Sequence, residues 1–129
     1  MKTILIDAVH TFVNDIGIID QKIYELLEQY NAPKIIVTNA PAEKFEQYGL
    51  NYVPYPVFTL SKNPSKLDPE YFNMLLEEYS IFASECIYFE HNKDAISSAK
   101  SVGITSHYFD KEKRDLKSLR EFLDKNIQL

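Results

Sequence analysis

Polar side chains that could carry out phosphoryl chemistry follow four apolar runs of the sequence. They are Asp7 and His10 after the first run, Thr38 and Asn39 after the second, Lys62 and Lys66 after the third, and Glu90 and His91 after the fourth. A carboxylate such as Asp7 can attack phosphorus or hold a divalent cation, and Glu90 would complete a hard-oxygen site suited to Mg²⁺. A hydroxyl and an ammonium can hold the oxygens of a transferring phosphoryl group. This set of residues indicates phosphoryl transfer if the fold brings the four runs together.

The apolar runs are typical of buried strands, and the stretches between them have the spacing of helices. The runs lie at residues 3–9, 34–38, 57–60, 85–89 and 105–109, and the expected helices at 19–30, 41–48, 69–79, 94–102 and 116–127. Strands that alternate with helices predict an α/β fold, here a three-layer, doubly wound, Rossmann-like sheet of five parallel strands with helices on both faces. Ligands of such sheets bind beyond the carboxyl ends of the strands, where the polar residues lie.

Composition predicts a single globular domain and argues against several classes of partner. The chain has 129 residues, of which 45% are hydrophobic and 26% charged, so we expect one domain over residues 1–129. A net charge of -5 without a basic cluster argues against nucleic acid as a partner. No apolar stretch approaches the length of a membrane span and no leader pattern precedes the first strand, so we expect a cytoplasmic protein. Cys86 stands alone in an apolar run and is expected to be a buried core thiol.

Four stretches resemble the motifs of the haloacid dehalogenase (HAD) superfamily, in the order in which that family carries them. They are ILIDAVHTF at 4–12, IIVTN at 35–39, KLDPEYF at 66–72 and IYFEH at 87–91. The resemblance runs from Thr3 to about Phe109 and implies the HAD-like core fold. Only about thirty residues separate Asp7 from Thr38, and Thr38 from Lys66, which leaves no room for a cap domain.

The resemblance assigns roles to the residues that match the motifs. In that family the first aspartate forms an aspartyl-phosphate intermediate, and this role falls to Asp7. Thr38, Asn39 and Lys66 would bind the phosphoryl oxygens. Lys66 is preferred over Lys62 because it opens the KLDPEYF stretch, although leucine stands where proline is usual, and Lys62 remains the alternative.

The resemblance also implies a magnesium site. Mg²⁺ would be held by Asp7, by Glu90 and by the backbone carbonyl of Val9, with His91 at the position of the usual second acid. The expected activity is that of a Mg²⁺-dependent phosphatase acting on a phosphorylated substrate. A site without a cap would suit a large or macromolecular substrate, or a protein partner that covers it.

Departures from the family pattern leave two functions open. Phosphatases of the family use a second aspartate as general acid and base where this chain has Val9, and losing such a group costs roughly 10²–10⁴-fold in rate. His10 replaces the usual glycine of the tight turn, and it is a candidate substitute because histidine titrates near neutrality. His91 is a poorer partner for Mg²⁺ than a carboxylate. The alternatives are a weak or atypical phosphatase and a catalytically inactive binding or regulatory domain.

A dehalogenase is disfavoured, although the start Asp7-Ala8-Val9 also resembles that branch of the family. Dehalogenases carry a cap domain and an arginine at the site. In this sequence the only arginines, Arg114 and Arg120, lie far downstream of the motifs.

Overall fold

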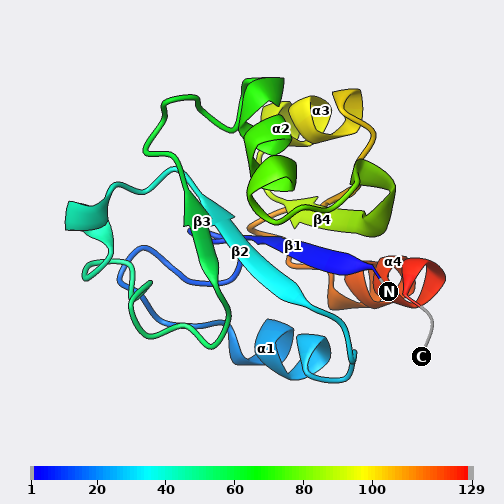
Figure 1. Ribbon diagram of the computed structural model, residues 1–129. Coiled ribbons are helices and arrows are strands. Elements are labelled where there is room, and N and C mark those ends of the chain that lie inside the picture. The colour runs from blue at the N-terminus through cyan, green and yellow to red at the C-terminus, as the bar shows by residue number, and fades with distance from the viewer. Residues whose placement is uncertain (1, 128–129) are drawn as a thin grey trace.

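The computed structural model describes residues 2–127, which form five strands and four α-helices (Figure 1). The elements are β1 (Thr3–Asp7), α1 (Gln21–Leu27), β2 (Lys34–Thr38), β3 (Val57–Thr59), α2 (Pro69–Glu78), β4 (Cys86–Glu90), α3 (Lys93–Ser101), β5 (Thr105–Tyr108) and α4 (Leu116–Asn126). Two 3₁₀ helices, Ala42–Lys44 and Ala83–Glu85, precede β3 and β4. All five expected strands are present, whereas the helix expected over 41–48 is reduced to a 3₁₀ turn.

The five strands form one parallel sheet in the order β3-β2-β1-β4-β5. The chain adds strands first on one side of β1 and then on the other, so β1 and β4 flank the point where the winding direction reverses. Ile6 pairs with Phe89, and therefore Asp7 and Glu90, the next residue of each strand, emerge together at this point. The predicted doubly wound α/β fold is confirmed, and its switch point is where such sheets bind ligands.

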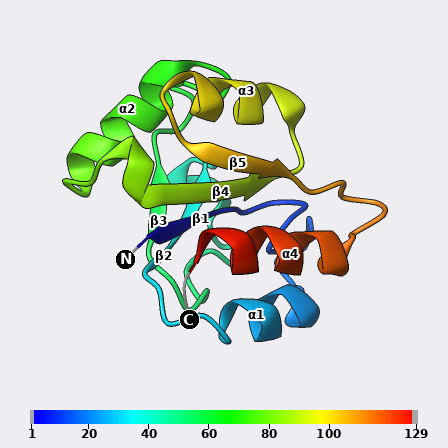
Figure 2. The same cartoon turned by 90° about the vertical axis from the view of Figure 1, so that its right-hand side faces the viewer.

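Helices cover both faces of the sheet, with α1 and α4 on one face and α2 and α3 on the other (Figure 2). Successive side chains of β1 point to opposite faces of the sheet, because a strand is pleated. Ile4 and Ile6 pack with Ile23 of α1 and Leu119 of α4, while Leu5 packs on the opposite face. β1 is buried along its whole length, which explains the apolar run at its centre, residues 4–6.

Each α-helix begins at a capping residue whose side chain accepts a backbone N–H of the first turn. These residues are Asp20, Asp68, Asn92 and Asp115. Such caps satisfy N–H groups that have no partner inside the helix. Asp68, which caps α2, and Asn92, which caps α3, each lie two residues after a residue of the site, Lys66 or Glu90. These caps therefore set the position at which each helix begins after the site.

Two long connections near the site touch each other at glycines. Gly17, in the loop after β1, and Gly49, after the first 3₁₀ helix, both have positive φ angles, of 84° and 65°. A Cβ atom on Gly17 would lie 2.8 Å from the backbone nitrogen of Gly49. The contact therefore requires glycine at both positions, and it fixes the segment of residues 41–50 against the loop after β1.

Cys86 is buried at the start of β4, as the sequence predicts. Burial raises the pKa of its thiol to about 12, so the group is an unreactive core residue. In the part of the chain that the structure describes, no helix combines the length and apolar character needed to cross a membrane.

Candidate active site

Asp7 ends β1 with its carboxylate buried, and three side chains contact it. Lys66 Nζ lies 2.7 Å from Oδ1, the Thr11 hydroxyl donates to Oδ2 at 2.6 Å, and His91 Nδ1 lies 2.5 Å from Oδ2. Burial by itself would raise the pKa of Asp7. The Lys66 ammonium and the His91 hydrogen bond outweigh burial and hold that pKa well below its usual range. Asp7 is therefore ionised, as a carboxylate nucleophile must be.

Glu90 ends β4 and is fully buried beside Asp7. Its Oε1 accepts from Lys66 Nζ at 2.8 Å and from the Tyr88 hydroxyl, and its Oε2 accepts the backbone N–H groups of His91 and Asn92, both at 3.1 Å. Burial and the neighbouring Asp7 raise the pKa of Glu90. The sequence analysis missed Tyr88. The two-residue alternation of a strand would have placed it on the same face as Glu90.

Lys66 reaches both carboxylates from the loop that precedes α2. Its backbone N–H donates to Asn39 Oδ1 at 2.8 Å, which ties the loop to the end of β2. Burial would lower the pKa of Lys66, but Asp7 and Glu90 raise it above its ordinary value. Both lysines line the pocket, but only Lys66 makes an ion pair with Asp7 in the described residues, so the preference for Lys66 as the phosphate ligand stays a prediction.

His91 places its Nδ1 between the two carboxylates, 2.5 Å from Asp7 Oδ2 and 3.1 Å from Glu90 Oε2. Hydrogen bonds to Asp7 and Glu90 raise the pKa of His91 to about 9, so the imidazole is protonated near neutrality. Lys66 and His91 then supply two positive charges against two carboxylates. The centre of the site is electrically balanced by the protein itself.

His10, Thr38 and Asn39 line the same pocket as Asp7. The His10 ring lies edge-on to the His91 ring, with 5.5 Å between the ring centroids. The Thr38 hydroxyl oxygen accepts the Ala40 N–H at 3.1 Å, so its own hydrogen can be donated to a ligand. Asn39 uses its carbonyl oxygen to hold the Lys66 loop and its amide nitrogen to contact that loop at 3.3 Å. Its expected contact with phosphate stays a prediction.

Arg114, in the segment after β5, holds the turn that follows Asp7 from outside the pocket. Its guanidinium donates to the His10 carbonyl at 2.9 Å, to the Thr11 carbonyl at 2.6 Å and to the Asp20 carboxylate at 2.9 Å. His10 has a φ of 74°, a left-handed conformation that is unfavourable for a residue with a Cβ atom. Arg114 therefore holds a strained turn directly after Asp7. No local signal in the sequence points to this contact, because the two segments are distant along the chain.

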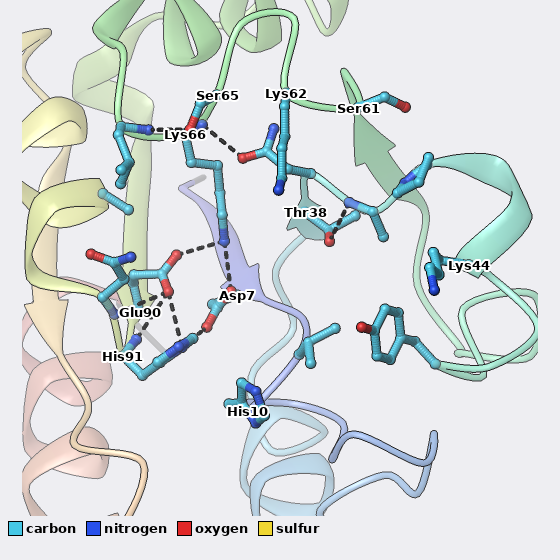
Figure 3. A pocket seen from close by; sticks show the side chains of 18 residues that line it. Asp7, His10, Thr38, Lys44, Ser61, Lys62, Ser65, Lys66, Glu90 and His91 are labelled. Carbon is cyan, nitrogen blue, oxygen red and sulfur yellow. Dashed lines mark hydrogen bonds and ion pairs between the residues drawn. The ribbon is translucent and has the colours of Figure 1, made fainter.

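A cavity of about 580 Å³ opens over these residues (Figure 3). Asp7, Lys66, Glu90 and His91 lie on one side of it, and residues of segments 38–48 and 61–67 form most of the remaining wall, together with Val9, His10, Asn92 and Ala95. This volume is within the range of small-molecule sites. The polar ends of four strands thus meet in one pocket.

Asp7, Glu90 and His91 could hold a metal ion, since each offers one ligand atom and these atoms lie within 4.8 Å of one another. The two buried carboxylates supply the hard oxygens that Mg²⁺ prefers, whereas an imidazole nitrogen suits transition metals better. Val9, whose backbone carbonyl is the fourth expected ligand, lines the same cavity. The donor set therefore fits a divalent cation. All four carboxylate oxygens already accept hydrogen bonds from the protein, so a cation would have to replace some of these contacts.

Comparisons with known proteins identify the fold. No protein-family model and no curated protein matches the chain, but solved structures do. A HAD-superfamily hydrolase of subfamily IA from Geobacter sulfurreducens superposes with a TM-score of 0.64 at 12% identity, over 82% of this chain and 85% of that one. The core domain of a protein assigned as a phosphoglycolate phosphatase from Streptococcus pneumoniae gives a TM-score of 0.63 at 16% identity, over 95% and 96% of the two chains.

A third structure contains ligands. It is an aspartate-to-alanine variant of a HAD-family enzyme from Bacteroides thetaiotaomicron, in complex with magnesium and inorganic phosphate. It superposes with a TM-score of 0.66 at 13% identity, over 84% of this chain and 93% of that one. The chain thus has the HAD-like fold, as its four motif-like stretches predict.

Proposed function

We propose that this protein is a HAD-like phosphatase that hydrolyses a phosphate ester through an aspartyl-phosphate on Asp7. The observation that carries the proposal is the ionised carboxylate of Asp7 in the pocket, with Lys66 Nζ 2.7 Å away. In this proposal Lys66 and the Thr38 hydroxyl, which line the same pocket, hold the phosphoryl oxygens. The HAD-like neighbours include hydrolases and a protein assigned as a phosphatase, which supports this class of reaction.

The reaction has two steps. In the first, an Asp7 carboxylate oxygen attacks phosphorus, the bond from phosphorus to the ester oxygen breaks, and the leaving alcohol takes a proton from His10. In the second, water attacks phosphorus of the aspartyl-phosphate, gives its proton to His10, and releases phosphate and the Asp7 carboxylate. His10 is assigned this role because it lines the pocket and Val9 has no proton to transfer.

Mg²⁺ is the proposed cofactor. Asp7, Glu90 and the Val9 carbonyl would hold it, with His91 at the fourth position. The bound ion would offset the negative charge of the phosphoryl oxygens. The neighbour in complex with magnesium and phosphate and the ligand set around Asp7 support this assignment.

We further propose that the domain of residues 1–129 acts in the cytoplasm without a cap domain, on a phosphorylated substrate. In the absence of a cap, the entrance can admit a bulky or macromolecular substrate, or a protein partner can cover it. The short connections β1–β2 and β2–β3 support this arrangement, because they contain only α1 and a 3₁₀ helix.

A second candidate function is that of a catalytically inactive binding or regulatory domain. Two observations favour it: Val9 replaces the usual general acid, and the protein's own Lys66 and His91 contact the carboxylates that a metal would use. In this alternative the pocket would bind an anionic ligand without turning it over.

Turnover of p-nitrophenyl phosphate with Mg²⁺ separates the two functions. The phosphatase proposal expects hydrolysis by the wild-type protein that falls to background in Asp7→Asn, a variant of nearly unchanged side-chain size. Circular dichroism confirms that both proteins are folded. Equal background in both proteins would reject the phosphatase and support the binding domain.

A further inference from the structure

The cavity extends well beyond the residues that would hold a phosphoryl group. Its outer wall carries Lys44, at the end of the first 3₁₀ helix, and Lys62, in the loop after β3. Figure 3 shows Lys44 across the pocket from Glu90 and His91, and Lys62 between Lys66 and Thr38 with its ammonium extending toward the interior. About 580 Å³ leaves room for the body of a small molecule between Asp7 and these lysines, since ligand pockets span roughly 300–1,000 Å³.

Lys44 and Lys62 differ from Lys66 in having no acidic partner. Within residues 2–127, ion pairs involve Lys66, His91 and Arg114 but neither of these two lysines. Glu43 and Glu46 are the acids nearest to Lys44 along the chain. Neither lines the cavity, and Glu46 accepts hydrogen bonds from Tyr52 and Asn51. In a chain of net charge -5, two uncompensated ammonium groups on one cavity wall make a local site of positive potential, which attracts anions.

The backbone that presents Lys62 is strained. Ser61 and Lys62 are consecutive residues with positive φ angles of 50° and 69°, a conformation that residues with a Cβ atom rarely adopt. The Ser61 N–H donates to Thr59 Oγ1 at 3.2 Å and the Asn63 N–H to the Leu60 carbonyl at 2.9 Å, which hold the turn at the end of β3. Strain of this kind is concentrated at ligand-binding positions. Both strained residues line the cavity.

From these observations we propose that Lys44 and Lys62 form a second anion subsite, which selects small phosphate esters that carry a further anionic group, a carboxylate or a second phosphate. The proposal rests on the phosphatase function proposed above and specifies its substrate class. The scissile phosphate lies at Asp7, and the second anion is attracted by the positive potential of the two lysines, which act as point charges from separate parts of the cavity wall. Such a substrate is far smaller than the macromolecule that the capless arrangement alone would admit.

A matched pair of compounds tests the subsite. 3-Phosphoglycerate and glycerol 3-phosphate share the phosphate ester and differ at the far end, where one has a carboxylate and the other a hydroxymethyl group. We expect a lower KM for 3-phosphoglycerate, and a preference that falls about fivefold for each of Lys44→Gln and Lys62→Gln, the upper range for exposed ion pairs. The preference also falls as ionic strength rises. Lys100→Gln, an exposed lysine of α3 outside the cavity, leaves it unchanged.

Binding to the Asp7→Asn variant, measured by calorimetry with the same two compounds, separates failure of the subsite from failure of the phosphatase. Lysine-dependent preference for 3-phosphoglycerate in the Asp7→Asn variant, together with no turnover by the wild-type protein, would support the subsite and reject the enzyme. Turnover in which the Lys44→Gln/Lys62→Gln double variant keeps the full wild-type preference would overturn the subsite and leave the phosphatase standing. If neither compound binds and neither is hydrolysed, both proposals are wrong.

Discussion

Replacement of Lys66 by methionine removes the ammonium that lies between two buried carboxylates. Lys66 Nζ is 2.7 Å from Asp7 Oδ1 and 2.8 Å from Glu90 Oε1, and the three side chains are 13%, 2% and 0% exposed. In Lys66→Met, Asp7 and Glu90 face each other with only His91 to balance them. The desolvation of two carboxylates is then no longer offset.

The expected loss follows from the burial of these groups. Removing one partner of a buried ion pair costs about 3–5 kcal/mol because it leaves an uncompensated charge. A domain of this size has an unfolding free energy of about 5–15 kcal/mol, and each kcal/mol shifts Tm by about 4 °C. Lys66→Met should therefore lower Tm by roughly 12–20 °C.

Urea denaturation followed by circular dichroism measures this loss, with Lys62→Met as the control. Lys62 lies in the same loop and lines the same cavity but makes no ion pair in residues 2–127, so its replacement should change stability by about 0.5 kcal/mol or less. Adding Glu90→Gln to Lys66→Met should restore part of the loss, since one carboxylate is then neutral. A Lys66→Met protein within about 1 kcal/mol of the wild type would refute the reasoning.

Three further predictions concern the turn after Asp7 and the opposite side of the sheet. Val9→Asp should raise kcat for p-nitrophenyl phosphate by roughly 100-fold because a carboxyl group at the family's usual position is expected to transfer the proton better than His10, and an unchanged kcat would contradict that explanation. Arg114→Ala should lower the unfolding free energy by about 2 kcal/mol because the guanidinium holds backbone carbonyls after β1. The control is Arg120→Ala, which loses a contact to Gln29. Equal losses in the two variants would contradict the role of Arg114 in holding this turn. Burial lowers the pKa of His107, so below about pH 6.5 the unfolded chain takes up a proton that the folded chain resists, and stability is lost as the pH falls. The free energy of unfolding of the wild type should therefore exceed that of His107→Gln by less at about pH 5.5 than at about pH 7.5. A difference that stays constant with pH would show that folding does not change the pKa of this histidine.

The strands and the edge where the site lies are predictable from the sequence because both follow from local patterns. A strand buried on both faces must be apolar almost throughout, as in ILI at residues 4–6, and it must end where polar residues begin. Parallel strands end at the same edge, and therefore Asp7, Thr38 and Glu90 are brought together by topology alone. Their positions could be predicted without any knowledge of side-chain contacts.

Contacts between distant segments were not predictable in the same way. Arg114 reaches the loop after β1, and the Tyr71 hydroxyl donates to the Thr38 carbonyl at 2.7 Å, yet neither residue belongs to a local motif that would indicate its partner. The choice between Lys62 and Lys66 depends on the Asn39 side chain, which fixes the loop. Such contacts join residues that are distant along the chain, so local sequence spacing does not predict them.

The segment over residues 41–50 shows how tertiary contacts override local preference. Pro41 and Gly49 are typical of the start and end of a helix, but the structure contains only the 3₁₀ turn Ala42–Lys44. The close contact between Gly17 and Gly49 holds the chain in irregular turns there. This same irregular segment carries Lys44 to the wall of the pocket.

The central claim is that Asp7 carries the phosphoryl group during turnover. Acid quenching of the wild-type protein within the first turnover of p-nitrophenyl phosphate, followed by mass spectrometry of peptides, tests it directly. We expect the mass of one phosphoryl group on the peptide that contains Asp7, and its absence from Asp7→Asn. Hydrolysis without such a peptide, or with the phosphoryl group on another residue, would contradict it.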